Sequence, residues 1–302
     1  MKTWQKVAIF FAVYALLLIA LGLIFGSDGK NEEFQPQNEF LLEPWVSLSI
    51  LGIDMSINKA VLYIVLAAAL TCVAMVLIAN RMAAKPNKTQ MAVEIAYDVI
   101  RQQITRDNLD DKMASRWFPF LGTLFFFILF SNVIGLIPLP TNTAETFSLF
   151  GLEIPSFALY AATANISIPL VLTLVVWIAY NVEGVRKHGP LGYLKTWLPA
   201  GLEEMNPVGK FLIFLIEAIS QFVRLISLSV RLFANILAGH LLLLFMGGGL
   251  AVLLGLTALG VLTFPMAFAF YVFEIVIVAG LQAFIFSILT AIYLGGATSE
   301  GH

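Results

Sequence analysis

Ionisable residues interrupt one of the most apolar stretches of the chain. Glu217, Arg224 and Arg231 fall between residues 207 and 246, where Leu, Ile, Phe and Val dominate. An ionisable group at the centre of a bilayer costs at least about 2.5–3.5 kcal/mol. Arg231 stands in the middle of the run, which argues against a side chain that snorkels to the interface. Because arginine stays charged at physiological pH, these residues predict a fixed charge held inside a membrane.

A second set of polar residues has the chemistry of a proton relay. His240 follows Arg231 by nine residues, and Glu274 and Gln282 lie in the next long apolar run. Histidine gains and loses a proton near neutral pH, and a carboxylate in an apolar helix needs a partner. His240 is the nearest chemical candidate for that partner. For His240 alone, the alternative is a buried histidine bonded to a carbonyl group.

Helical periodicity places the first set on one face. At about 100° per residue, the polar residues lie within about 40° of Arg231 on either side. They are Glu217, Ser220, Arg224, Ser227 and Asn235. The stripe is roughly 27 Å long, nearly the thickness of the hydrocarbon layer. His240 lies about 180° away, so the helix is predicted to face two polar environments.

Some of these residues also have structural alternatives. Arg224 could form an ion pair with Glu217, seven residues away on the same face. Interhelical hydrogen bonding without a part in transport is the alternative for Ser227, Asn235 and Gln282.

Composition decides the class of protein. Of 302 residues, 60% are hydrophobic and only 12% are charged, and the mean hydropathy is +0.90, which is typical of a membrane protein. The net charge of −2 gives no indication of nucleic acid binding, and the single Cys72 excludes an intramolecular disulfide. We find no phosphate-binding loop, HExxH or GxSxG motif, and with three histidines we expect no metal and no cofactor.

The elements that position these residues are apolar helices. The sequence predicts an all-α membrane protein with five core transmembrane helices, at about residues 60–79, 117–137, 160–182, 207–246 and 262–294. Residues 1–26 form an N-terminal apolar segment, either a retained span or a signal peptide. Residues 27–58 form an acidic external loop, and residues 59–302 form the membrane domain.

Basic residues give the orientation. Thirteen of the 17 Lys and Arg residues fall on one side of the predicted spans, whereas only Lys30 and Lys59 fall on the other. The basic side is expected to be cytoplasmic, which also places the C-terminus in the cytoplasm. Residues 89–109 carry apolar and charged side chains on different faces, which predicts an amphipathic helix on the cytoplasmic surface.

The residues around Arg231 resemble a known family. SLSVRLFANILAGHLLL (227–243) is similar to the signature of the a subunit of rotary F-type ATP synthases, bacterial type. Further similar stretches are PFLGTLFFFILFSNVIGLIPLP (119–140), YNVEGVRKHGPLGYLK (180–195) and LQAFIFSILTAIYL (281–294). The resemblance covers residues 45–297 and implies two long tilted helices that wrap a ring of c subunits.

The resemblance also implies roles for the polar residues. Arg231 matches the essential arginine between two aqueous half-channels. Positions of the outer half-channel are matched by Asn235, His240, Glu274 and Gln282. Positions near the cytoplasmic exit are matched by Glu217 and Ser227, with Arg224 at a basic position on the same stripe. The family separates the last two outer positions by seven residues, whereas Glu274 and Gln282 are eight apart. Either a π-bulge restores the facing, or Glu274 acts from a shifted position.

By this resemblance the chain is a proton-conducting stator subunit in the bacterial plasma membrane, with no catalytic site of its own. Its partners would be the c-subunit ring, the b-subunit peripheral stalk, the rest of the ATP synthase and protons, with no nucleic acid. Protons are favoured over sodium because His240 and Glu274 suit proton transfer. The rival is a stand-alone secondary ion transporter, for which the sequence shows no internal repeat. An intramembrane enzyme lacks a nucleophile or metal constellation.

Overall fold

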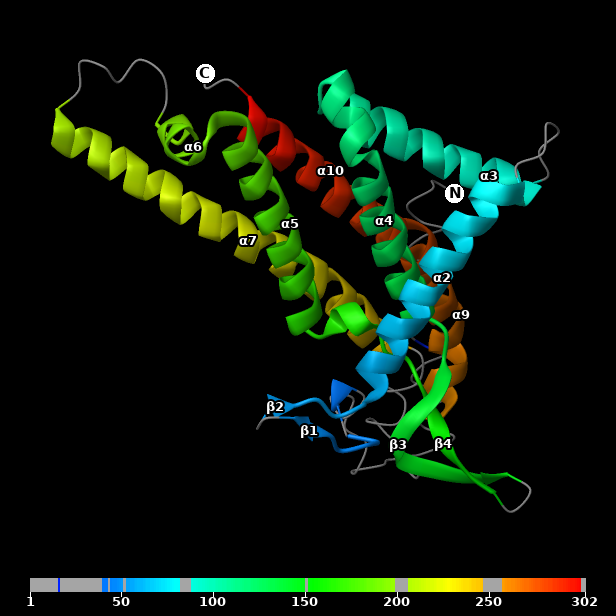
Figure 1. Cartoon of the computed structure of the whole chain (residues 1–302). Helices are drawn as coiled ribbons and strands as arrows, with labels where there is room; N and C mark the ends of the chain where they lie inside the picture. Colours follow the sequence, from blue (N-terminus) through cyan, green and yellow to red (C-terminus); the bar gives the residue numbers. More distant parts are fainter. Residues whose placement is uncertain are drawn as a thin grey trace. The chain divides into compact units, whose positions relative to one another are not determined.

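The chain divides into two compact units, which are described separately (Figure 1). The computed structural model describes residue 16 and residues 40–42, 44–50, 53–81, 88–149, 152–198, 206–246 and 257–299. Unit 1 comprises Met1–Leu41, Pro138–Tyr160 and Leu237–Val276, and unit 2 comprises Leu42–Ile137, Ala161–Ile236 and Ile277–His302. The predicted N-terminal apolar segment and most of the acidic loop lie outside the described residues.

Unit 2 holds most of the long helices. They are α2 (Lys59–Arg81), α4 (Asp111–Gly135), α5 (Ser167–His188), α10 (Ala279–Thr298) and all but the end of α7 (Pro207–Leu244). Helix α4 packs against α2 and α10, and α10 also packs against α5. Leu121, Ile128 and Phe286 are among the fully buried side chains of this core.

Five helical segments of the described residues are long and apolar enough to cross a membrane. The fifth is Pro265–Thr298, in which α9 (Thr257–Phe273), η5 (Glu274–Val278) and α10 follow without a break. The predicted all-α membrane fold with five core spans is therefore confirmed. The predicted domain boundaries at residues 26 and 58 stay predictions.

The predicted surface helix is helical, with a change of geometry inside it. Helix α3 (Lys88–Asp98) continues into the π-helix η2 (Val99–Arg106), which packs against α4 and α10. Ile100 and Ile104 are buried, whereas Arg101 and Arg106 are exposed. This division into one apolar and one charged face agrees with the amphipathic pattern.

A sharp corner joins α5 to α6 (Pro190–Thr196). Gly189 has φ +74°, which glycine adopts without a Cβ penalty, and Pro190 begins α6 at a position that needs no N–H donor. The Tyr193 ring packs where a Cβ on Gly184 would lie, and its hydroxyl donates to Oδ1 of Asn181 at 3.0 Å. Burial raises the pKa of the Tyr193 phenol above its ordinary value, so this hydroxyl stays a donor at neutral pH.

Unit 1 contains strands that the sequence did not predict. From PLP (138–140) onward, β3 (Leu139–Leu149) pairs antiparallel with β4 (Leu152–Ala158). The register shifts between Pro140 and Asn142, close to a proline that cannot donate to the ladder. A second, short pair in unit 2 joins β1 (Ser49–Ile50) to β2 (Ile53–Asp54). In the chain, β1–β2 precedes α2 and β3–β4 lies between α4 and α5, and neither pair changes the helical fold class.

Candidate functional site

The polar stripe is carried by one uninterrupted helix. Helix α7 runs for 38 residues without a break, so the angular positions expected from its sequence apply along its length. Only 11% of its spanning stretch is buried, compared with 56% for α4. Beside the polar stripe the helix exposes Leu212, Ile216, Ile219, Val223, Ile226 and Val230. Around Arg231 the face that carries the stripe is therefore largely uncovered by the described residues.

Arg231 lies on this uncovered face. Its side chain is exposed, and within the part of the chain that the structure describes its guanidinium has no hydrogen bond, ion pair or ring contact. Ser227 and Asn235, one turn before and one turn after it, are exposed as well. A charge in an apolar span without an internal partner points to a partner outside the chain.

The part of the stripe that precedes Arg231 in α7 forms a network. Arg224 Nη2 pairs with Glu217 Oε1 at 2.9 Å, which is the ion pair considered from the sequence. Gln221 Nε2 donates to the same oxygen at 3.3 Å, and Tyr180 Oη donates to Gln221 Oε1 at 2.8 Å. Arg224 also lies over the Tyr293 ring, 5.8 Å from its centroid. Three helices, α5, α7 and α10, thus hold the Glu217 carboxylate in place.

Tyr180 and Gln221 were missed in the sequence. Gln221 follows Glu217 by four residues on a helix, and this spacing is a usable signal. Tyr180 comes from α5, and no pattern in its own segment marks it. Both side chains are nearly fully buried, at 3% and 4% exposure, whereas Glu217 and Arg224 are only partly covered.

His240 and Glu274 come together in unit 1, as the sequence predicted. The His240 Nδ1 atom lies 3.7 Å from Glu274 Oε1, and the side chains are 0% and 4% exposed. This distance is too long for a direct hydrogen bond, and Glu274 Oε1 accepts none from the described residues. One bridging water or a small movement would join the two groups for proton transfer.

Gly239 makes room for the Glu274 carboxylate. A Cβ atom on Gly239 would overlap the Glu274 carboxylate, so the carboxylate occupies the space that a side chain would fill. The missing side chain lets the helix that carries Glu274 approach α7 closely. The sequence marks Gly239 as a small residue, but its particular neighbour could not be predicted.

Asn235 and Gln282 pair between α7 and α10 in unit 2. Asn235 Nδ2 donates to Gln282 Oε1 at 2.9 Å, while Gln282 is 2% exposed. Gln282 Nε2 is buried and has no hydrogen-bond partner among the described residues. The pair is an interhelical hydrogen bond, and it leaves one buried donor for a further acceptor.

The helix changes its geometry at Glu274. Residues Glu274–Val278 form a π-helix, η5, between α9 and α10. A π-helical turn takes up one residue more than an α-helical turn. The step from Glu274 to Gln282 is one residue longer than the seven of the family, and the π-helix absorbs this extra residue locally. A π-bulge was one of the two ways by which the sequence could accommodate the eight-residue step, and the structure contains it.

Comparison with known proteins identifies the family. The sequence pattern of the family described as "ATP synthase A chain" matches residues 61–295. The chain belongs to the ATP synthase A chain family. The resemblance predicted around Arg231 is thereby confirmed over most of the chain.

Individual members of the family agree along most of their length. An ATP synthase subunit a from Rubrobacter xylanophilus is 37% identical over 257 residues, covering 83% of this chain and 88% of the relative. Proteins of the same name from Parvibaculum lavamentivorans and Beijerinckia indica are 34% and 32% identical over 279 and 277 residues. They cover 91% and 90% of this chain, and 97% and 99% of the relatives. With its five spans, the chain is a multi-pass membrane protein of this family.

Proposed function

We propose that the chain is the proton-conducting stator subunit of an F-type ATP synthase. Family membership supports this role, and the single observation that carries it is the exposed guanidinium of Arg231 on α7, which has no partner among the described residues. The ring of c subunits is the partner that covers this face. The b-subunit peripheral stalk and the rest of the synthase complete the assembly. ATP is made in the rest of the synthase, outside this subunit.

Protons enter from the outer side near His240 and Glu274. Their nearly complete burial and the 3.7 Å between them suit a relay that takes up a proton and passes it on. Asn235 and Gln282 match positions of the same half-channel, and the Gln282 amide donor, which has no partner among the described residues, is suited to orient water. The proton then reaches a carboxylate on a c subunit. Its neutral form can face lipid, where the charged form would be too costly, and so the ring turns.

Protons leave toward the cytoplasm along the polar stripe. When the ring carboxylate meets Arg231, the fixed positive charge favours the ionised carboxylate, and the proton departs past Ser227 toward Glu217. Arg224 holds Glu217 in position, so its role is structural within the path. Arg231 also separates the two paths, because nine residues of regular helix place His240 about 180° away from it.

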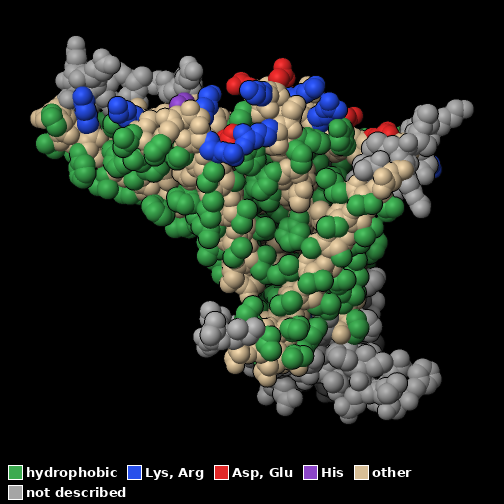
Figure 2. Space-filling view, in the orientation of Figure 1, with side chains coloured by type: hydrophobic (Ala, Val, Ile, Leu, Met, Phe, Trp, Pro, Cys, Tyr) green, Lys and Arg blue, Asp and Glu red, His purple; other side chains and the backbone are tan. Residues whose placement is uncertain are grey.

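The distribution of charge supports the orientation. Figure 2 shows Lys and Arg side chains of unit 2 gathered at one end of its spans, over α3, η2 and α6, while hydrophobic side chains cover the spans. Basic residues mark the cytoplasmic side, so this end and the C-terminus of α10 face the cytoplasm. The membrane is the bacterial plasma membrane, since the relatives are bacterial proteins.

Purification of the chain from its native membrane tests the stator role against a stand-alone transporter. The stator role predicts co-purification with a ring of small hairpin subunits and ATP-dependent proton pumping by the assembly after reconstitution. A chain that runs alone and moves an ion without ATP-linked activity would contradict the proposal.

Tyr180 and Gln221 should tune the exit path. Replacing Tyr180 by Phe removes the hydroxyl that holds Gln221, so Glu217 loses part of its positioning. One hydrogen bond is worth about 1 kcal/mol, which predicts an approximately fivefold slower proton-driven ATP synthesis. Tyr97→Phe is the control, because the Tyr97 hydroxyl accepts a hydrogen bond from Arg101 outside this network. Equal rates for both variants in fully assembled complexes would remove Tyr180 from the path.

A further inference from the structure

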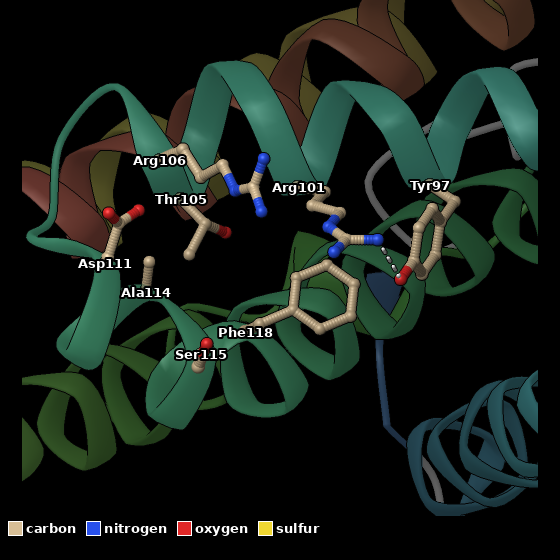
Figure 3. Close-up of a pocket in the computed structure, with 8 residues that line it drawn as sticks. All are labelled: Tyr97, Arg101, Thr105, Arg106, Asp111, Ala114, Ser115 and Phe118. Atoms are coloured by element: carbon tan, nitrogen blue, oxygen red, sulfur yellow. Dashed lines mark hydrogen bonds between the residues drawn. The ribbon is translucent and has the colours of Figure 1, made fainter.

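A cavity lies between the surface helix and the beginning of α4. Its volume is about 410 Å³, and its walls come from α3, η2 and the first turns of α4 (Figure 3). None of its lining residues belongs to the polar stripe or to the His240–Glu274 pair. The proposed proton path therefore leaves this cavity without a role.

Two guanidinium groups dominate one side of the cavity. Arg101 and Arg106 both line it; in Figure 3 the Arg106 guanidinium extends toward the side of Arg101, and the Arg101 guanidinium turns toward Tyr97. Arg101 Nη1 donates to Tyr97 Oη at 3.3 Å, but no described carboxylate forms an ion pair with either arginine. Two like charges in the lining of one cavity are stabilised by an anion bound there, and guanidinium groups bind phosphate with two parallel hydrogen bonds.

The opposite wall is apolar. Ala114 and Phe118 of α4 line it, and the Phe118 ring packs edge to face on Tyr97 with centroids 5.1 Å apart. Ser115, also on α4, adds a hydroxyl. A cavity with charge on one wall and hydrocarbon on the other fits an amphipathic anion better than a free one.

The level of the cavity in the membrane also favours an amphipathic anion. It opens where α4 begins its span at Asp111, beside an amphipathic helix, and this is the depth of lipid headgroups. The Asp111 carboxylate lies in the lining and disfavours a doubly charged phosphate monoester, but it can accept hydrogen bonds from headgroup hydroxyls. Only the assignment to the cytoplasmic leaflet rests on the proposed orientation.

We propose that this cavity binds the headgroup of an anionic phospholipid with a singly charged phosphodiester and free hydroxyls, as in phosphatidylglycerol. The phosphate lies between Arg101 and Arg106, the headgroup hydroxyls face Asp111 and Ser115, and the acyl chains leave along Phe118. Basic pockets between helices on the cytoplasmic side are a known means of lipid-specific recognition. The bound lipid would fix the surface helix to the first turns of α4.

Native mass spectrometry of the full chain in detergent, titrated with phosphatidylglycerol or phosphatidylcholine, tests this proposal. The wild-type chain should retain one phosphatidylglycerol at concentrations at which phosphatidylcholine is lost. Arg101→Gln and Arg106→Gln should each weaken this binding about fivefold. Arg186→Gln is the matched control, since Arg186 is an exposed arginine at the end of α5 that does not line the cavity, and it should bind as wild type.

A further variant distinguishes the effect of the arginine charges on lipid binding from the effect of the space in the cavity. Ser115→Phe leaves both arginines in place but fills the cavity from an exposed position, and it should also lose the lipid. Unchanged retention in the two arginine variants and in Ser115→Phe would overturn the proposal. Equal competition by soluble glycerol phosphate would assign the cavity to a free anion instead of a lipid. Loss of the lipid in the purified complex, with retention by the chain alone, would assign it to an acidic segment of a partner subunit.

These outcomes are independent of the proposed stator role. The lipid titration needs neither a proton gradient nor ATP, so it gives its answer even if the chain purifies without a ring. Conversely, the assembly could pump protons with ATP while this subunit fails to bind phosphatidylglycerol. That result would leave the stator role intact and contradict the lipid site.

Discussion

Replacing Arg231 by alanine is expected to abolish proton-driven ATP synthesis. The guanidinium is exposed on α7 and has no partner among the described residues, so its charge is available to the ring. An opposite charge within about 4–6 Å favours an ionised carboxylate by 1–3 orders of magnitude. Its removal should lower the rate of synthesis about 100-fold or more, measured in membrane vesicles that contain the assembled complex.

Two controls distinguish loss of charge from loss of assembly. The content of subunit a in purified complexes should be unchanged in Arg231→Ala, because the side chain has no hydrogen bond, ion pair or ring contact to lose among the described residues. Arg231→Lys keeps the charge but not the planar fork and should retain part of the activity. Synthesis by Arg231→Ala near the wild-type rate, at normal assembly, would falsify the role of this residue.

Gly239→Ala should produce the second largest loss of proton transport, and it should do so without unfolding the chain. The new methyl group overlaps the Glu274 carboxylate, which is the end of a flexible side chain and can move aside. The movement of the carboxylate therefore changes the distance of 3.7 Å between His240 Nδ1 and Glu274 Oε1. A misplacement of about 1 Å between reacting groups can lower a rate 100-fold, so passive proton flux through the membrane sector should fall at least tenfold.

Gly280→Ala is the matched control for this prediction. Gly280 lies in α10, and a Cβ at that position meets nothing within 4 Å, so proton flux should stay at the wild-type level. The same flux assay applies to His240→Ala, Glu274→Ala and the double variant. If the two residues form one relay, the double variant is no worse than either single one, and additive losses would contradict a shared relay.

The helices were predictable from the sequence because a bilayer imposes long apolar runs. Helix α7 was expected at residues 207–246 and is found at Pro207–Leu244. A continuous helix made the polar stripe predictable too, since its angular positions follow from residue spacing. The Glu217–Arg224 and His240–Glu274 pairs were predictable because an ionisable group in a span needs a partner, and few candidates exist.

Contacts that depend on the approach of separate helices were not predictable. The pairing of Asn235 with Gln282, and the place of Tyr180 in the Glu217 network, depend on how α7 meets α10 and α5.

Backbone geometry was only partly predictable. The eight-residue step from Glu274 to Gln282 left a π-bulge and a shifted acid as alternatives, whereas the β3–β4 hairpin has no apolar period that would have distinguished it from a loop.

Disulfide cross-linking tests the central claim most directly, namely that the stripe of α7 faces the c ring. The exposed native Cys72 is first replaced by serine, and a cysteine is then placed at Ser227, one turn from Arg231. Val175→Cys on α5 is the control, because Val175 is 45% exposed on a span outside the stripe.

With a cysteine beside the ring carboxylate, mild oxidation of the complex should join Ser227→Cys to a c subunit and stop ATP-driven rotation, and reduction should restore it. The Val175 variant should give no such product. A c-subunit product from Val175→Cys and none from Ser227→Cys would contradict the placement of the stripe against the ring.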